Sequence, residues 1–184
     1  DLQMPVIQKL RELKLRVVAV NPRTLDEVFR AIQVIGDACG ANAAARRTVD
    51  GLKARVAAVE SKTAVTPADS RPRVFVEIWN DPLMTAGAGT FVDDLVRRAG
   101  GRNVVGHIDG WPQISPETVI SAHTDVVILT CFNRAEVMAR HEWRKVPAIV
   151  QGRVFEVHPD LMVRPGPRLV DGLETLAGLF AGAQ

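Results

Sequence analysis

The stretch that decides the fold is Asp125-Val126-Val127-Ile128-Leu129-Thr130. Its unbroken apolar run is typical of a strand whose two faces are both buried. Strands of this kind occur in parallel sheets, which helices cover on both sides. We therefore predict that the chain contains an α/β domain built around this strand.

Strand and helix signals alternate around this stretch from about residue 73 onward. Strands are predicted over 74–79 and 154–157, and helices over about 91–99, 134–144 and from about 167. This order predicts a three-layer α/β lobe with a mainly parallel sheet. Asp93 and Asp94 fall in the first helical turn, where the helix dipole favours them, and Trp143 is expected to pack within a helix.

The first sixty residues predict a different arrangement. A helix over 5–14 is followed by a strand over 15–20, and Thr24 with Glu27 forms a capping box for a helix that ends near Cys39. A second helix is predicted over about 42–62. Its apolar positions are spaced by three and four residues, and its length is about 30 Å.

The strand predicted over 15–20 has no obvious place in the main sheet, and a lone strand cannot satisfy its backbone groups. We expect residues 1–23 to be the remnant of a second α/β lobe that precedes this chain. Residues 24–66 then form a helical linker, and 67–184 form a C-terminal α/β ligand-binding lobe. An unpaired strand also favours self-association with another copy of the chain.

Composition excludes several classes of protein. The 184 residues have a net charge of +2 with interspersed signs, which argues against a nucleic-acid-binding protein. The sequence has no apolar run long enough for a transmembrane helix. Cys39 and Cys131 are far apart, so two buried, inert thiols are favoured over a disulfide. The four histidines are scattered without the spacing of a metal site, and no metal is expected.

Three loops are candidates for a ligand site because ligands of open α/β sheets bind beyond the carboxyl ends of the strands. The first carries Trp79, Asp81 and Met84, the second carries Trp111, and the third spans 160–168. Two indoles, two thioethers and a guanidinium suit a large, flat, partly apolar ligand. The alternative is that both indoles plug the ends of the sheet as core residues.

Within the third loop, Arg164 is expected to point into the cleft, whereas Arg168 is expected to be structural. The turn at 87–90 could hold an anion, but an ordinary loop that leads into a helix is favoured. Ser115 has no adjacent histidine, and no GxSxG motif is present, so no catalytic set emerges. We therefore predict that the protein is not an enzyme.

The segment Trp111-Pro112-Gln113-Ile114-Ser115-Pro116-Glu117 combines an aromatic side chain with a helix start. Ser115 suits the N-cap, Pro116 the first helical position, and Glu117 the first turn. The segment would present a flat apolar surface beside a rigidly held negative charge.

Four stretches together resemble the class III substrate-binding proteins of ABC importers, especially the vitamin B12 (cobalamin) branch. They are 21–25, 82–87, 111–117 and 164–169, and the more generic 100–104 also fits. The resemblance covers nearly the whole chain. It departs at Ile78, where relatives carry an aromatic residue, and at Met84, where an aromatic residue can occur. The chain also has no tyrosine, the iron ligand of many haem-binding relatives.

The resemblance implies two lobes joined by one long helix, here about 42–62, with the ligand held between them. The resemblance implies that Trp79, or a neighbouring residue, Trp111 and Arg164 face the ligand, and the loops that carry them add Asp81, Met84 and Met162 to the candidate ligand-binding residues. Glu117 would dock onto arginines of the membrane permease. The ligand is expected to be a corrinoid that is carried, with no resident cofactor. The implied location is periplasmic or extracellular, with a lipid anchor left open.

Other functions remain open at the level of sequence. A ferric-siderophore or haem carrier of the same class is the first alternative. An enzyme related to metal chelatases or nitrogenase-like subunits is the second, with Cys131 as its candidate residue. A single lobe would offer only half of a cleft, so weak ligand binding by this chain alone is expected.

Overall fold

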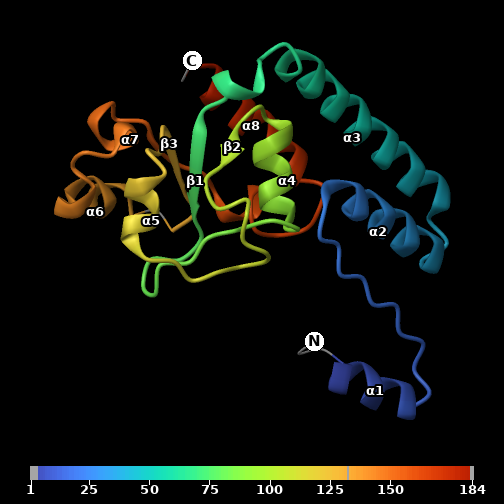
Figure 1. Cartoon of the computed structure of the whole chain (residues 1–184). Coiled ribbons are helices and arrows are strands. Elements are labelled where there is room, and N and C mark those ends of the chain that lie inside the picture. Colours follow the sequence, from blue (N-terminus) through green and yellow to red (C-terminus); the bar gives the residue numbers. More distant parts are fainter. Residues whose placement is uncertain (1–3, 132, 183–184) are drawn as a thin grey trace.

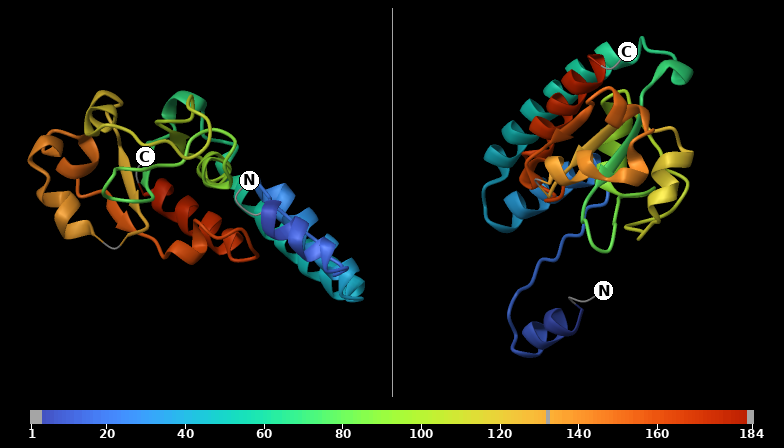
Figure 2. Two further views of the ribbon diagram at one scale, coloured as in Figure 1. Left: turned by 90° about the horizontal axis from the view of Figure 1, so that it is seen from below. Right: turned by 90° about the vertical axis from the view of Figure 1, so that its left-hand side faces the viewer.

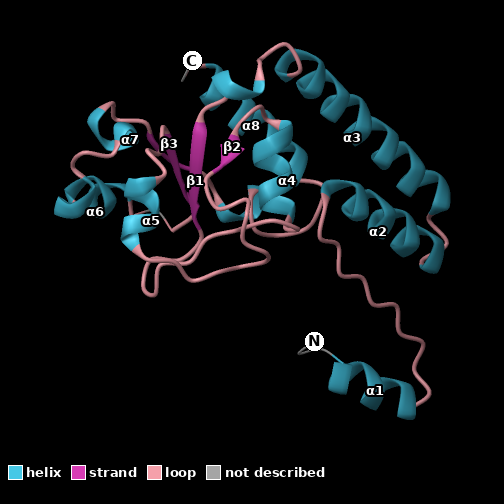
Figure 3. Cartoon of the chain, viewed as in Figure 1, coloured by secondary structure: helices cyan, strands magenta, loops and turns pink. Residues whose placement is uncertain are grey.

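The computed structural model describes residues 4–131 and 133–182, and its centre is a four-stranded parallel sheet between two layers of helices (Figures 1 and 3). The predicted α/β class is confirmed. The strands, in the spatial order β2-β1-β3-β4, are β1 (Arg73–Glu77), β2 (Arg102–Asn103), β3 (Val126–Leu129) and β4 (Val154–Glu156).

The register brings the carboxyl ends of the strands to one edge of the sheet. Val76 of β1 lies opposite Ile128 of β3, and Ile128 lies opposite Phe155 of β4. All pairings are parallel, so the loops after β1, β3 and β4 emerge together at the lower end of β1 in Figure 1. We call this edge the carboxyl rim.

Each face of the sheet is covered by its own core cluster. Val74, Val76 and Ile128 pack toward α4 (Phe91–Arg98), α8 (Leu169–Ala181), and the helices α2 (Leu25–Ala38) and α3 (Asn42–Thr63). Phe75, Val127 and Leu129 pack on the other face against a layer of short helices. These are α5 (Pro116–Ser121), α6 (Arg134–Ala139), the 3-10 helix η2 (His141–Trp143) and α7 (Pro147–Val150).

Trp143 anchors the second cluster and confirms its predicted role in packing. Its side chain is fully buried, and its ring meets Phe75 edge-on with 5.9 Å between the centroids. Edge-to-face contacts of this kind match the positive edge of one ring to the negative face of the other. The contact ties η2 to the middle of the sheet.

The helix α3 follows the predicted apolar spacing and runs along the outside of the lobe (Figure 2). Its 22 residues span about 33 Å. The predicted stripe is buried against α2 and α8, and consists of Ala45, Val49, Leu52, Val56 and Val59.

The start of α2 is held both by its own cap and by a neighbouring helix. Thr24 accepts a hydrogen bond from the backbone of Glu27 at 3.2 Å, as predicted, whereas the Glu27 carboxylate reaches the backbone of Arg23. The buried backbone N–H of Leu25 donates to the Asp94 carboxylate of α4 at 3.0 Å. This last bond fixes α2 to the sheet-covering layer.

The predicted strand over 15–20 is not formed. After α1 (Met4–Glu12), the chain runs without regular structure to Thr24, and Leu15, Val18 and Val20 are exposed. A strand needs a partner for its N–H and C=O groups, and the structure describes no segment that pairs with it. Figure 1 shows α1 and this segment lying apart from the lobe.

Other boundaries differ by a few residues. The helix predicted over 134–144 breaks at Arg140, whose ψ of 108° is extended, so the stretch divides into α6 and η2. Residues 148–150 belong to the short helix α7, and the edge strand β2 was not predicted. Two further 3-10 helices are η1 (Ala68–Ser70), just before β1, and η3 (Pro159–Leu161), after β4.

Among the described residues, no helix combines the length and the apolar character that crossing a membrane requires.

We expect Asp94→Ala to lower the free energy of unfolding by about 1–3 kcal/mol, because the buried N–H of Leu25 loses its acceptor. The control is Asp171→Ala, a half-buried carboxylate whose partner Arg55 keeps Glu174. Its expected cost is below about 1 kcal/mol. Urea unfolding measures both, and equal losses would contradict this reading of Asp94.

Candidate functional site

The loop after β1 and the loop before α5 join into one surface at the carboxyl rim. Met84 forms isolated bridges with both Trp79 and Gln113. The backbone N–H of Thr85 donates to Pro112 at 3.1 Å, and that of Ile114 donates to Leu83 at 3.0 Å. The left panel of Figure 2 is seen from the side of these loops. Backbone pairing therefore fixes the segments that carry the two predicted indoles.

Trp79 stands at the surface of the rim. The residue is 57% exposed, and its indole N–H donates to the backbone oxygen of Asp81 at 2.9 Å. The Asp81 side chain is exposed and Met84 is half-buried. The alternative that Trp79 plugs the sheet as a core residue does not hold.

Trp111 is also at the surface, with 42% of the residue exposed. Its ring meets Phe91, the first residue of α4, edge-on at 5.5 Å between centroids. It borders a hollow of about 500 Å³, whose other walls are formed by residues 21–23 and 89–91. The indole is therefore oriented by Phe91 but keeps an open face.

Trp79 borders a separate pocket of about 550 Å³, which we call the rim pocket. It lies where β1 and β3 end, and the segment after β4 closes it. Its lining residues are Ile78, Trp79, Asn80, Thr130, Cys131, Asn133, Glu136, Pro159 and Val163. A pocket at the carboxyl ends of parallel strands is the usual place for a ligand in this class of fold.

The sequence reasoning missed the four polar residues Asn80, Thr130, Asn133 and Glu136. The rule that placed Trp79 at a strand end applies equally to the loop after β3, where it selected only Cys131. Their polar side chains give one wall of the rim pocket a hydrogen-bonding character that the predicted set lacked.

The third predicted loop reaches the rim pocket through Val163, next to Pro159, rather than through its arginine. Arg164 is exposed and pairs with Asp160 at 2.7 Å, and Arg168 pairs with the same carboxylate at 2.9 Å. The sequence predicts that Arg164 points into the cleft, but it is held by this ion pair and is not among the residues that line the rim pocket. Asp160 holds both guanidinium groups at the surface beside the pocket.

Met162 does not belong to this surface. Its side chain has no exposed area and lies in the core cluster beneath α8. The expectation that its thioether faces a ligand is therefore wrong in this structure. η3 turns the chain so that Val163 faces the pocket and Met162 faces inward.

Glu117 is exposed in the first turn of α5, as its position in the sequence predicts. Its own backbone N–H and the Ser115 side chain hydrogen-bond to the carboxylate and lower its pKa. Ser115 occupies the N-cap position but makes no capping bond to the backbone. The group is thus a charged, oriented carboxylate at neutral pH.

The two cysteines are free, and one differs from expectation. Cys39 is exposed rather than buried. Cys131 is half-buried in the rim pocket, where its thiol donates to the backbone oxygen of Ile78. Burial raises the pKa of the Cys131 thiol, which makes it a poor nucleophile.

Other candidate chemistry is limited. Among the described residues, no group of three His, Cys, Asp or Glu side chains could hold a metal ion. In the turn at 87–90, the N–H groups of Gly87 and Ala88 donate to Gly110 and Ile108 at 2.8 and 2.7 Å. These bonds support the interpretation of the turn as an ordinary loop that leads into α4.

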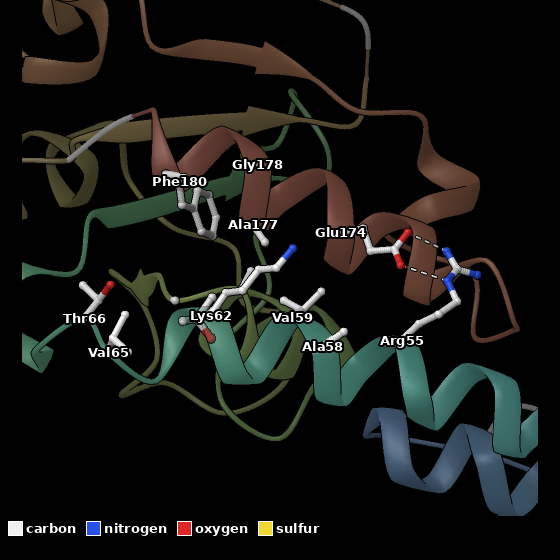
Figure 4. Close-up of a pocket in the computed structure, with 14 residues that line it drawn as sticks. Arg55, Ala58, Val59, Lys62, Val65, Thr66, Glu174, Ala177, Gly178 and Phe180 are labelled. Atoms are coloured by element: carbon white, nitrogen blue, oxygen red, sulfur yellow. Dashed lines mark hydrogen bonds and ion pairs between the residues drawn. The ribbon is translucent and has the colours of Figure 1, made fainter.

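A further groove lies between α3 and α8, away from the rim (Figure 4). Its volume is about 550 Å³, and it is crossed at one end by Arg55, which donates to both carboxylate oxygens of Glu174 at 2.9 and 2.6 Å. Its other end meets Gly100, beside the amino ends of β1 and β2. Since ligands of such sheets bind at the opposite edge, the rim is the better candidate.

Comparison with known proteins gives a consistent result. Residues 6–161 match the family described as periplasmic binding protein. The ABC transporter substrate-binding lipoprotein YvrC of Bacillus subtilis is 30% identical over 174 residues, which cover 93% of this chain and 55% of that protein. A cobalamin-binding protein of Halobacterium salinarum is 30% identical over 186 residues, covering 95% and 49%.

The fold also matches a solved structure. The periplasmic vitamin B12 binding protein BtuF of Vibrio cholerae superimposes with a TM-score of 0.83 at 22% identity, covering 98% of this chain and 70% of that one. The chain spans about half the length of the curated relatives it matches.

We expect Ser115→Ala to raise the pKa of Glu117 toward its ordinary value without restoring it fully, because the backbone N–H remains as a donor. The carboxylate would then be lost at a higher pH than in the parent protein. NMR titration of the Glu117 side chain measures this, with the exposed Glu142 as a control. An unchanged Glu117 titration would contradict a role for Ser115.

Proposed function

Since the chain belongs to the periplasmic binding protein family, we propose that it acts in an ABC importer as the substrate-binding protein, which captures a corrinoid and delivers it to the membrane permease. It carries its ligand without transforming it. This is a binding and delivery function rather than catalysis.

The observation that carries the proposal is the pair of exposed indoles at the carboxyl rim, Trp79 and Trp111. Each is fixed in place, Trp79 by its bond to Asp81 and Trp111 by its contact with Phe91. Large aromatic surfaces held open to water favour a ligand that can cover them. A corrin ring is broad and flat and has amide groups at its edge, which suit the polar wall of the rim pocket.

The relatives support the same ligand class. Among the curated proteins, a cobalamin-binding protein is 30% identical to this chain in a match that covers 95% of this chain. The proposed ligand surface consists of Trp79, Asp81, Met84, Trp111 and Arg164, and we include Asn80 and Asn133 because they line the rim pocket.

The domain organisation is part of the proposal. Residues 67–184 would form one ligand-binding lobe, 24–66 the connection, and 1–23 part of a second lobe that faces the rim. Two features support this division. The long helix α3 packs along the lobe, and the apolar side chains of Leu15, Val18 and Val20 are exposed. A ligand held between two lobes is covered from both sides.

Glu117 is the proposed contact with the permease. Its carboxylate is exposed, ionised and held on a helix start beside the rim. A fixed charge at an interface mainly sets the rate and orientation of docking. The proposed location is accordingly periplasmic or extracellular, and YvrC, a lipoprotein, supports attachment through a lipid anchor.

Calorimetric titration with cyanocobalamin tests the proposed identity of the ligand. The titration uses the intact protein, in which the proposed second lobe is also present. We expect saturable binding that weakens by about tenfold or more in Trp111→Ala, because the ring provides a preformed contact, and less in Trp111→Phe. Val65→Ala is the control, since this exposed apolar side chain lies on the α3–α8 groove, away from the rim.

Haem and a ferric siderophore are titrated in parallel. Binding of either one without cyanocobalamin binding would overturn the corrinoid assignment in favour of that ligand. Equal losses of affinity in Trp111→Ala and Val65→Ala would overturn the assigned role of the rim.

The exposed apolar segment also predicts self-association of this chain. We expect its apparent mass to rise with concentration in size-exclusion chromatography with light scattering, and Val18→Lys with Val20→Lys to abolish the rise. A monomer at all concentrations would contradict this expectation.

A further inference from the structure

We propose that Arg140 is a positioning residue that holds two walls of the rim pocket in register. The relevance of this to ligand binding rests on the proposed function. The arrangement itself is a property of the folded chain. Arg140 does not line the pocket, yet it bonds directly to two residues that do, and through Glu77 to a third.

The base of the arrangement is a buried ion pair. Glu77, the last residue of β1, has no exposed surface. Arg140 donates to its two carboxylate oxygens, from Nη1 at 2.7 Å and from Nη2 at 3.3 Å. The guanidinium also lies over the Trp143 ring, 4.6 Å from its centroid. The sheet and the η2 core therefore fix the cation from two sides.

From this fixed position Arg140 reaches both walls. Its Nη2 donates to the side-chain oxygen of Asn80, which follows β1. It also pairs with Glu136 of α6 at 3.7 Å. Asn80 in turn donates to Glu136 at 2.8 Å, which closes the ring between the two walls. The loop that presents Trp79 and the start of α6 are thereby joined.

The Glu77 carboxylate also orients Asn133. Its side-chain amide donates to Glu77 Oε1 at 2.7 Å, and a carboxylate only accepts hydrogen bonds, so the orientation of the amide is determined. The Asn133 oxygen is left buried without a partner among the described residues. An unpaired buried acceptor destabilises this placement of the Asn133 side chain. The hydrogen bond to Glu77 is therefore needed to keep Asn133, and with it this wall of the pocket, in place.

An arginine is required for this geometry. A guanidinium has five donors in a rigid plane and can serve Glu77, Asn80 and Glu136 together, whereas a lysine offers one compact charge. A buried ion pair adds little stability relative to an apolar pair of similar volume. The main consequence of the arrangement is therefore the placement of the pocket walls.

The test separates positioning from folding by removing both charges at once, in Glu77→Gln with Arg140→Met. No buried charge is then left unpaired, because Glu136, which also loses Arg140, is exposed. The amide introduced at position 77 can still accept from Asn133, and the thioether introduced at position 140 can still lie over Trp143. We expect amide exchange in segments 78–84 and 133–139 of the intact protein to become about tenfold faster or more, while β3 exchanges as in the parent protein. Cyanocobalamin affinity should fall about tenfold.

The matched control is Arg73→Met with Asp125→Asn, which removes an ion pair of 2.8 Å at the opposite end of the same strand. It should leave exchange at 78–84 and ligand affinity unchanged. Arg140→Lys keeps Glu77 paired, and we expect faster exchange in the two pocket segments with an unchanged sheet. If amide exchange in the double variant becomes faster in every segment of the protein, Arg140→Lys is the variant that tests whether Arg140 positions the pocket walls.

Unchanged exchange of the pocket segments in both Arg140 variants would overturn the proposal, because Arg140 would then only neutralise Glu77. Faster exchange without any cyanocobalamin binding by the parent protein would support the positioning role and overturn the corrinoid assignment. The two failures are therefore distinguishable.

Discussion

Burial of both faces of the parallel sheet is the constraint on which the rest of the structure depends. Val74, Val76 and Ile128 face one helical layer, and Phe75, Val127 and Leu129 face the other. No sheet face is then free for a ligand, so contacts with solvent and partners are made at the ends of the strands. Since all pairings are parallel, the loops after β1, β3 and β4 meet at one rim.

Charge pairs determine how this rim is held. Glu77 and Arg140 lie directly beneath it and connect the loop after β1 to α6. On the outer side, Arg98 pairs with Asp26, Glu60 and Asp94, so one guanidinium joins α2, α3 and α4. These two clusters have different roles. The first places groups that a ligand would touch, and the second fixes the long helix that would lead to a second lobe.

Much of the fold follows from local patterns. The unbroken apolar run at 125–130 indicates a strand buried on both faces, and the apolar spacing of three and four residues along α3 identifies the helix face that must be buried. The apolar pattern could not predict that Trp79 and Trp111 are exposed, since an indole that follows a strand can equally be buried in the core. Tertiary packing decided it, through the Asp81 and Phe91 contacts.

Two wrong predictions and one missed contact show what local patterns omit. The segment 15–20 has strand composition, but a strand exists only with a partner. Met162 and Val163 are adjacent and both apolar, and only the turn of η3 determines which one faces the pocket. Arg140 lies within the helix predicted over 134–144, and nothing in the sequence reveals that it contacts a buried carboxylate 63 positions away.

The most direct measurement is the quenching of tryptophan emission in the intact protein during titration with cyanocobalamin, whose absorption overlaps that emission. The account predicts saturable quenching that is largely lost in Trp79→Phe with Trp111→Phe, in which only the buried Trp143 remains. Absence of saturable quenching in the parent protein, or its full persistence in the double variant, would contradict a ligand site built on the two rim indoles.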